Sequence, residues 1–93
     1  NGVSIFNNII DPTAGEKVSL NYTLARGGMV QVWVFDLSGT IVAQLFRGVQ
    51  EAGEHYVSWD GKNRAGRAVA RGIYFIRVLA PGLDEVRKVL VVK

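Results

Sequence analysis

The sequence predicts an all-β fold, an immunoglobulin-like sandwich of about seven antiparallel strands. Two observations predict it: apolar and polar residues alternate along short segments, and turn residues recur at short, regular intervals within 93 residues. No segment shows the sustained apolar stripe of a helix, and no internal repeat or linker divides the chain. Gly, Pro, Asn and Asp gather at 11–15, 26–28, 36–39, 47–53, 60–66 and 80–84. The expected strands lie between these turns, at 3–10, 17–24, 29–36, 40–46, 54–59, 72–80 and 85–92.

The composition predicts one small folded unit. Hydrophobic residues make up 48% of the chain and charged residues 20%, which is enough to pack a core and differs from the composition of disordered chains. A chain of this length buries roughly 60–70% of its unfolded surface when it folds. We therefore expect residues 1–93 to form one domain that folds alone.

The sequence carries no visible targeting or redox signal. Cysteine is absent, so the chain can form neither a disulfide nor a thiolate metal site. The longest apolar runs, such as 89–92, are too short to span a membrane, and no signal peptide precedes Val3. Because the chain begins at Asn1 without a methionine, we interpret it as a piece of a larger or processed protein.

Two expected strands indicate how the sheets are covered. The segment 17–24 alternates strictly and gathers four apolar side chains on one face: Val18, Leu20, Tyr22 and Leu24. Its other face is polar, as in a sheet with one solvated side. The segment 29–36 is apolar on both faces, because Met29, Trp33 and Phe35 lie opposite three valines. This pattern is typical of a more central or partly covered strand.

The segment 58–75, SWDGKNRAGRAVARGIYF, predicts a structured corner. His55, Val57 and Trp59 share one face of the preceding strand, so we expect Trp59 to close that strand against the core. Asp60 then begins a turn in which its carboxylate accepts backbone N–H groups, and Asn63 can do the same. Gly61, with Gly66, supplies the positive φ that a chain reversal needs.

The same segment allows three other interpretations, all of which we consider weaker. A calcium loop needs several oxygen ligands at alternating positions, whereas DGKN offers one carboxylate and one amide beside two cations. The basic side chains are the candidate partner contacts, able to meet phosphate or an acidic partner: Lys62, Arg64, Arg67 and Arg71. Solvated cations on a loop are the commoner explanation. Nucleic acid is not expected, because no flanking pair of exposed stacking aromatics is evident.

The sequence predicts no catalytic, cofactor or metal site, and the chain is not expected to be an enzyme. His55 is the only histidine, and Ser58 lies three residues further along the same strand, hence on the opposite face. Glu51 and Glu54 flank Gly53 in a loop, but paired catalytic carboxylates need a cleft that shifts their pKa values.

Three segments together resemble the Ig-like domain of the bacterial flagellar hook-capping protein FlgD, which also occurs widely at the C-terminal ends of exported bacterial proteins. The segments are FDLSGTIVAQLFRG, GEHYVSWDGKNRAGRAVARGIYFIRV and VRKVLVVK. The matching residues include Asp36, Gly39, Gly53, Trp59, Asp60, Gly61, Asn63, Gly66, Gly72, Ile73 and Tyr74. The resemblance covers nearly the full length, although NNIIDPTAGEKV replaces the family's usual first segment.

The resemblance implies a fibronectin-III-like sandwich in which Tyr74 is a corner tyrosine, with its hydroxyl bound to backbone. The chain is similar, more distantly, to the C-terminal sorting domains of the type IX secretion pathway. Those domains generally lack the Trp-Asp-Gly corner that this sequence has at Trp59, so we prefer the FlgD-like group. The resemblance also implies an exported location, in the periplasm, at the cell surface or outside the cell.

Two functions are open at this point. The first is a non-enzymatic accessory module, the C-terminal domain of an exported protein, that docks, spaces or assembles its parent through protein contacts. Its closing segment, 85–93, could pair with the edge of a partner's sheet. The second is a module that recognises cell-envelope polysaccharide through exposed aromatics, for which the candidates are Trp33, Phe35, Phe46 and Tyr56.

Overall fold

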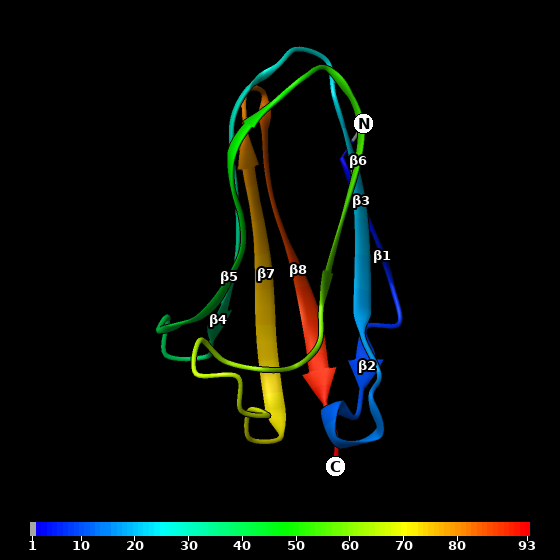
Figure 1. Ribbon diagram of the computed structural model, residues 1–93, viewed down its shortest axis with the longest axis vertical. Helices are drawn as coiled ribbons and strands as arrows, with labels where there is room; N and C mark the ends of the chain where they lie inside the picture. Colours follow the sequence, from blue (N-terminus) through cyan, green and yellow to red (C-terminus); the bar gives the residue numbers. More distant parts are fainter. Residues whose placement is uncertain (1) are drawn as a thin grey trace.

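The computed structural model describes residues 2–93 as two facing β-sheets with one hydrophobic core between them (Figure 1). The molecule is elongated, 38 × 22 × 19 Å. Its strands are β1 (Val3–Phe6), β2 (Ile9–Ile10), β3 (Val18–Leu24), β4 (Gly28–Asp36), β5 (Ile41–Gln50), β6 (Gly53–Trp59), β7 (Gly72–Ala80) and β8 (Leu83–Val91), with a 3₁₀ turn at Pro12–Ala14. The prediction of an all-β sandwich is confirmed.

The smaller sheet has the strand order β1-β3-β6, with both pairs antiparallel. β3 buries Val18, Leu20, Tyr22 and Leu24 and leaves the side chains between them exposed or half-exposed, as its alternation predicts. Trp59 lies opposite Val18 in the register, so the indole closes the core at the end of β6.

The larger sheet has the strand order β2-β8-β7-β4-β5. β8, β7, β4 and β5 pair antiparallel, and β2 joins β8 in parallel. The inner side chains of β4 and β7 are fully or almost fully buried: Val30, Val32, Val34, Tyr74, Ile76 and Val78. β-branched residues at these positions suit a pleated, buried surface.

The first expected strand, 3–10, is wrong as a single element. The chain forms β1 in the smaller sheet, then turns at Asn7, which has a φ of 57°, and forms β2 in the larger sheet. An asparagine tolerates this left-handed conformation better than most residues. Val3 and Ile10 are thereby both buried, although they belong to different sheets, and the sandwich has eight strands instead of about seven.

One further expectation needs correction. The strand expected at 40–46 continues to Gln50, because β4 begins at Gly28 and offers partners as far as the pair Gly28–Gln50. That the closing segment, 85–93, pairs through its edge with a partner's sheet stays a prediction. In the structure that edge is occupied at its end, where Leu90 and Val92 donate hydrogen bonds to the carbonyls of Asn8 and Ile10, both 2.8 Å.

Candidate interaction surfaces

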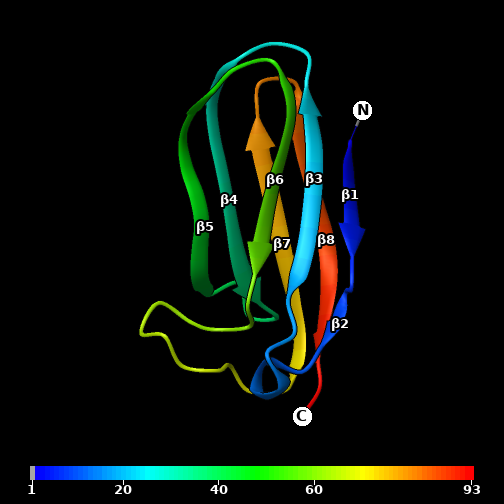
Figure 2. The same cartoon turned by 45° about the vertical axis from the view of Figure 1, so that its right-hand side comes forward.

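The corner loop, residues 60–71, joins β6 to β7 and projects from one end of the sandwich (Figure 2). Trp59, only 1% exposed, anchors its beginning. The indole Nε1 of Trp59 donates a 2.9 Å hydrogen bond to the carbonyl of Lys62, and its ring lies 5.5 Å from that of Tyr74. The buried indole therefore fixes the path of the loop as it leaves the sheet.

Polar side chains close the turns inside the corner loop. The Oδ1 atom of Asp60 accepts the N–H of Lys62 at 3.1 Å. Asn63 Oδ1 accepts two N–H groups, those of Ala65 at 3.0 Å and Arg67 at 3.1 Å. The sequence-based interpretation of these two residues as backbone partners agrees with this geometry.

Gly61 is required at its position for two reasons. Its φ is 75°, and a Cβ placed there would lie 2.5 Å from the Cβ of Pro12. Gly66 has a similar φ of 80°, but a Cβ there would meet nothing within 4 Å. Both glycines therefore serve the turn, and only Gly61 also serves the packing of the loop against the 3₁₀ turn.

Tyr74 fixes the end of the corner loop. Its hydroxyl donates a 2.7 Å hydrogen bond to the carbonyl of Ala70, which is the corner-tyrosine contact that the resemblance implies. Burial raises the pKa of Tyr74, and the nearby carboxylate of Asp36 adds to this effect. Val69 is buried and its N–H binds the carbonyl of Gly61 at 2.9 Å. The loop is thus tied to the core at both ends and across its middle.

The turn between β4 and β5 is built in the same way around Asp36. Its Oδ1 accepts the backbone N–H groups of Ser38 and Thr40, both at 3.0 Å, and the hydroxyl of Ser38 at 2.7 Å. These bonds lower the pKa of Asp36, and the bond from the Ser38 hydroxyl has the largest effect. Gly39 completes the turn with a φ of 87°. Gly53 and Gly72, the other motif glycines, begin β6 and β7 with φ of 126° and 149°.

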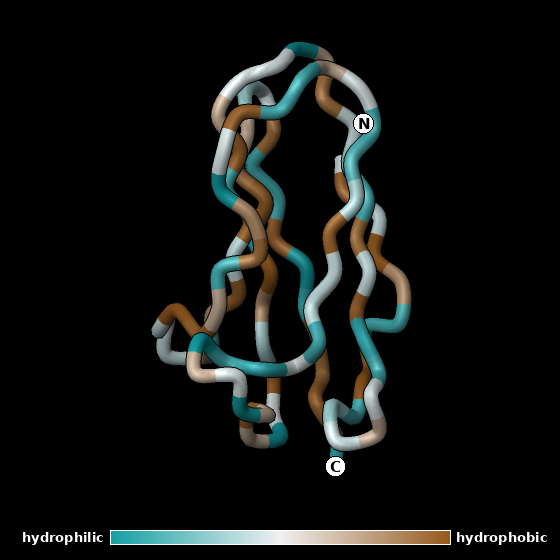
Figure 3. Tube along the Cα trace, viewed as in Figure 1, coloured by the Kyte–Doolittle hydropathy of each residue, from teal (hydrophilic) through white to brown (hydrophobic). Residues whose placement is uncertain are grey.

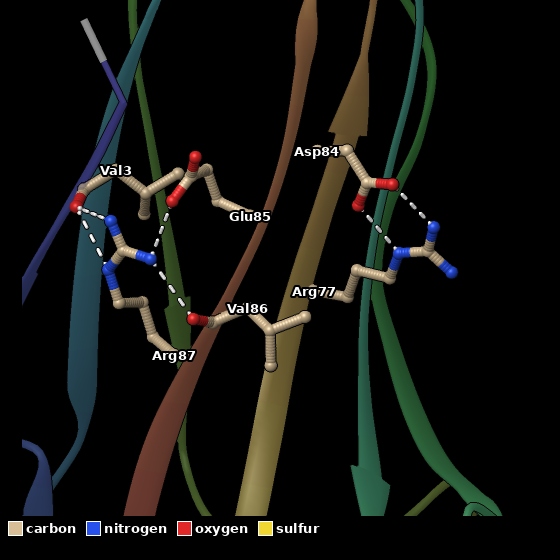
Figure 4. Close-up of polar contacts among 6 residues, drawn as sticks. All are labelled: Val3, Arg77, Asp84, Glu85, Val86 and Arg87. Atoms are coloured by element: carbon tan, nitrogen blue, oxygen red, sulfur yellow. Dashed lines mark hydrogen bonds and ion pairs between the residues drawn. The ribbon is translucent and has the colours of Figure 1, made fainter.

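The four basic residues of the corner loop stand on its surface. Lys62, Arg64, Arg67 and Arg71 are all exposed. Within residues 2–93, the two ion pairs are Arg77–Asp84 and Arg87–Glu85, both drawn in Figure 4, and neither includes a loop cation. The hydropathy-coloured trace in Figure 3 likewise shows hydrophilic residues along this loop. The loop therefore offers cations in a conformation that its own hydrogen bonds have already set.

A shallow, partly apolar hollow of about 500 Å³ lies between the corner loop and the start of β5. Arg64 belongs to its wall, together with Ile41 and three loop alanines: Ala65, Ala68 and Ala70. The backbone N–H of Arg64 donates to the carbonyl of Val42 at 3.2 Å, which holds the loop against the edge strand. A partner side chain that enters this hollow would meet both apolar and polar residues of the corner loop.

His55, weighed for catalysis in the sequence, contacts backbone and another ring. The Nε2 atom of His55 lies 2.7 Å from the carbonyl oxygen of Glu51, and its ring lies 5.8 Å from that of Tyr22. Ser58 is exposed on the opposite face of β6. Among residues 2–93, no three side chains of the His, Cys, Asp or Glu kinds lie close enough to hold a metal ion.

The four aromatics considered for polysaccharide do not form one site. Trp33 and Phe35 lie on the outer face of the larger sheet, whereas Phe46 packs against the core. Tyr56 is 69% exposed on the outer face of the smaller sheet, where the side chain of Glu54 raises its pKa. Only the first two share a surface.

The outer face of the larger sheet holds residues that the sequence reasoning did not single out. Phe75 stacks on Phe35 with ring centroids 5.5 Å apart. The guanidinium of Arg77 lies 5.3 Å from the ring centre of Trp33. The segment 72–80 is apolar on both of its faces, as 29–36 is, and this signal would have identified Phe75.

None of the described residues forms a helix with the length and hydropathy that a membrane crossing requires. A model of the FlgD Ig-like domain family matches residues 7–82. No curated protein sequence matches the chain.

Three solved structures share the fold over nearly the whole chain. PorZ of Porphyromonas gingivalis, a surface component of the type IX secretion system, matches 99% of the chain at 21% identity and a TM-score of 0.67. FlgD of Xanthomonas campestris, which caps the flagellar hook, matches 97% of the chain at 25% identity and a TM-score of 0.63. FlgD of Pseudomonas aeruginosa matches 97% of the chain at 23% identity and a TM-score of 0.59. The chain covers 12%, 62% and 64% of these three proteins, less than two thirds of each.

Proposed function

Since the chain belongs to the FlgD Ig-like domain family, we propose that it is a non-enzymatic module that docks or helps assemble an exported bacterial protein through protein contacts. Three solved relatives support this proposal, because one is a bacterial surface component of a secretion system and two are FlgD proteins, one of them described as essential to flagellar assembly. In each relative the fold is one part of a longer chain, so we also propose that residues 1–93 form one domain of a larger protein. Family membership alone gives the fold, and the contact must be sought on a surface.

The corner loop carries the proposal. Its cations Lys62, Arg64, Arg67 and Arg71 are exposed and take part in neither ion pair of residues 2–93. Because Trp59, Asn63 and Tyr74 already hold the backbone, little conformational entropy is lost when a partner binds. Cations held on a preorganised loop attract an acidic protein surface and speed its encounter. The hollow beside Arg64 adds apolar contact area for that partner.

Neutralising the loop tests the proposal in the full-length parent. The variant Arg64→Gln/Arg67→Gln/Arg71→Gln removes three loop cations whose side chains make no hydrogen bond within residues 2–93. A matched control, Lys17→Gln/Arg26→Gln/Lys93→Gln, removes three exposed cations outside the loop. We expect the loop variant to fold but to be lost from the parent's normal cell fraction, and the control to behave as wild type. Normal placement of the loop variant would contradict docking through these cations.

Polysaccharide binding is the second candidate, and the position of Trp33 favours it. This indole lies on the outer face of the larger sheet beside Phe35, whereas Trp59 is buried, so a ligand-dependent change in tryptophan fluorescence would report Trp33. A saturable shift during titration with envelope polysaccharide, abolished in Trp33→Phe, would support this function. A flat trace would count against it.

A further inference from the structure

The two outer faces of the sandwich differ in polarity. The smaller sheet presents mostly polar side chains outward, among them Ser4, Ser19, Asn21, Thr23, Glu54 and Ser58. The larger sheet presents Trp33, Phe35 and Phe75, together with exposed Met29, Ile41, Val49, Val86 and Leu90. An extended apolar surface of this kind on a folded protein marks an interaction site.

The side chains of this face form regular rows across β8, β7, β4 and β5, in that order. The first row is Lys88, Phe75, Phe35 and Ile41; the second is Val86, Arg77, Trp33 and Gln44; the third is Asp84, Leu79, Gln31 and Arg47. β7 and β4 form the centre of each row. Across this centre, Phe75 is next to Phe35, and Arg77 is next to Trp33.

Contacts within the chain hold the central side chains in place. Asp84 accepts two hydrogen bonds from Arg77, at 2.8 and 2.7 Å, as Figure 4 shows. The same guanidinium lies over the ring of Trp33, and Phe35 and Phe75 stack on each other. A surface whose large side chains are already ordered loses little entropy when it binds. The stacked guanidinium also occupies part of the aromatic surface that a sugar ring would need.

The size of the face fits a specific protein interface. Four strands at a spacing of about 4.8 Å and nine residues at about 3.3 Å each give an area on the order of 600 Å². Specific complexes bury roughly 600–1,000 Å² on each partner. The face is therefore large enough for a weak but specific complex.

We propose that this face binds the same face of a second copy of the chain. The two copies are related by a two-fold axis that runs parallel to the strands. The axis lies between the two facing sheets, in line with the boundary between β7 and β4. It therefore places β8 of one copy opposite β5 of the other, and β7 opposite β4. Phe75 then meets Phe35 of the second copy, and Arg77 meets its Trp33. Asp84 meets Arg47 of the second copy, so the third row ends in an ion pair on each side.

This pairing gives the one acid of the face a cation of the second copy, although each face has a net charge of +2. The face carries Arg47, Arg77, Lys88 and a single acid, Asp84. Across the axis, Asp84 meets Arg47 of the second copy and keeps its ion pair with Arg77 of its own chain. The remaining cation, Lys88, lies at the end of the first row, at the rim of the interface, where water can solvate it. Two sheets packed face to face in this way lie about 10 Å apart, the spacing of an ordinary sandwich core.

Sedimentation of the 93-residue chain over a wide range of concentrations tests the proposal. We expect wild type to shift from monomer to dimer as its concentration rises. Val86→Asp, a change at a half-exposed position on the face, should abolish the shift. Tyr56→Asp, on the opposite outer face, should leave it unchanged. If wild type stays monomeric at every concentration, the face does not bind a second copy of the chain and the proposal is overturned.

A charge exchange tests the two-fold geometry itself. Arg47→Asp and Asp84→Arg each put like charges together in a homodimer, so each alone should weaken dimerisation about tenfold or more. When the two variants are mixed, a heterodimer restores both ion pairs. The mixture should therefore form heterodimers at the protein concentrations at which wild type dimerises. A mixture that dimerises no more strongly than either variant alone would overturn this arrangement. The corner loop plays no part in either experiment, so their failure leaves docking through the loop untouched.

Discussion

At the scale of single residues, Trp59 is the side chain on which the core and the corner loop both depend. It is almost fully buried, it packs on Tyr74, and its indole N–H binds the carbonyl of Lys62. We predict that Trp59→Ala lowers the free energy of unfolding by about 3–5 kcal/mol, because the cavity cannot be filled by its neighbours. Urea unfolding followed by circular dichroism measures this. A loss below about 1 kcal/mol would contradict the role given to the indole.

Tyr74→Phe isolates the corner-tyrosine hydrogen bond. The substitution keeps the ring and removes the hydroxyl that donates to Ala70. We predict a loss of about 1 kcal/mol, the usual net contribution of one hydrogen bond, plus the cost of an unpaired carbonyl. Urea unfolding gives the loss, and amide hydrogen exchange of residues 68–71 should be faster in the variant than in wild type. Unchanged exchange in the loop would show that the hydroxyl does not hold it.

Gly61 and Gly66 provide a matched pair of substitutions. Both have φ near 80°, so alanine at either position carries the cost of a left-handed conformation, about 1 kcal/mol. Only at Gly61 would the added Cβ also strike Pro12. We predict that Gly61→Ala is clearly more destabilising than Gly66→Ala in thermal unfolding. Equal losses would mean that the contact with Pro12 is not tight in solution.

Much of the corner could be predicted from residue types. Asp60, Asn63 and the two glycines follow the chemistry of turns, and their partners lie within four residues along the chain. The contacts that depend on distant parts of the chain could not be predicted. Pro12 against Gly61 and the carbonyl of Val42 beside Arg64 come together only because the two sheets face each other.

At the scale of elements, the β4–β5 turn gives a pH dependence to stability. Hydrogen bonds, chiefly from Ser38, hold the pKa of Asp36 below its ordinary value. A carboxyl whose pKa is lower in the folded state stabilises the fold above its unfolded pKa of about 3.9, and this contribution is lost as the pH falls through the folded pKa. Asp11 and Asp84 show shifts in the same direction.

We therefore predict that wild type loses stability as the pH falls below about 4, and that Asp36→Asn loses less over the same range. Thr13 lowers the pKa of Asp11 and Arg77 that of Asp84, so both carboxyls continue to titrate in the variant and part of the slope remains. Thermal unfolding at a series of pH values measures both slopes. Parallel curves for the two proteins would contradict the shift at Asp36.

Strand existence could be predicted from the alternation of residues, but strand ends and sheet membership could not. The segment 3–10 is largely apolar, and nothing in its composition tells that the chain turns at Asn7 and passes from one sheet to the other. β5 passes through Gly48 because β4 supplies partners on the other side of the hairpin. Pairing across the sheet decided both cases against the local turn signal.

At the scale of the whole molecule, the sandwich presents two separate surfaces on one rigid frame. Arg87 contributes to that frame by donating from β8 to the carbonyl of Val3 in β1, at 2.9 and 3.2 Å, which joins the two sheets (Figure 4). The loop cations were found from the sequence, because charges in a turn segment are visible without a fold. The apolar face of the larger sheet was not, because only the strand order brings Phe75 beside Phe35.

The most direct test of the docking function compares three forms of the full-length parent in its own cell: wild type, a deletion of residues 1–93, and the loop variant Arg64→Gln/Arg67→Gln/Arg71→Gln. The measurement is the cell fraction in which the folded parent is found. We predict that the deletion and the loop variant both leave the normal fraction, because the loop cations make the docking contact. A parent that is placed normally without residues 1–93 would contradict a docking role for this domain.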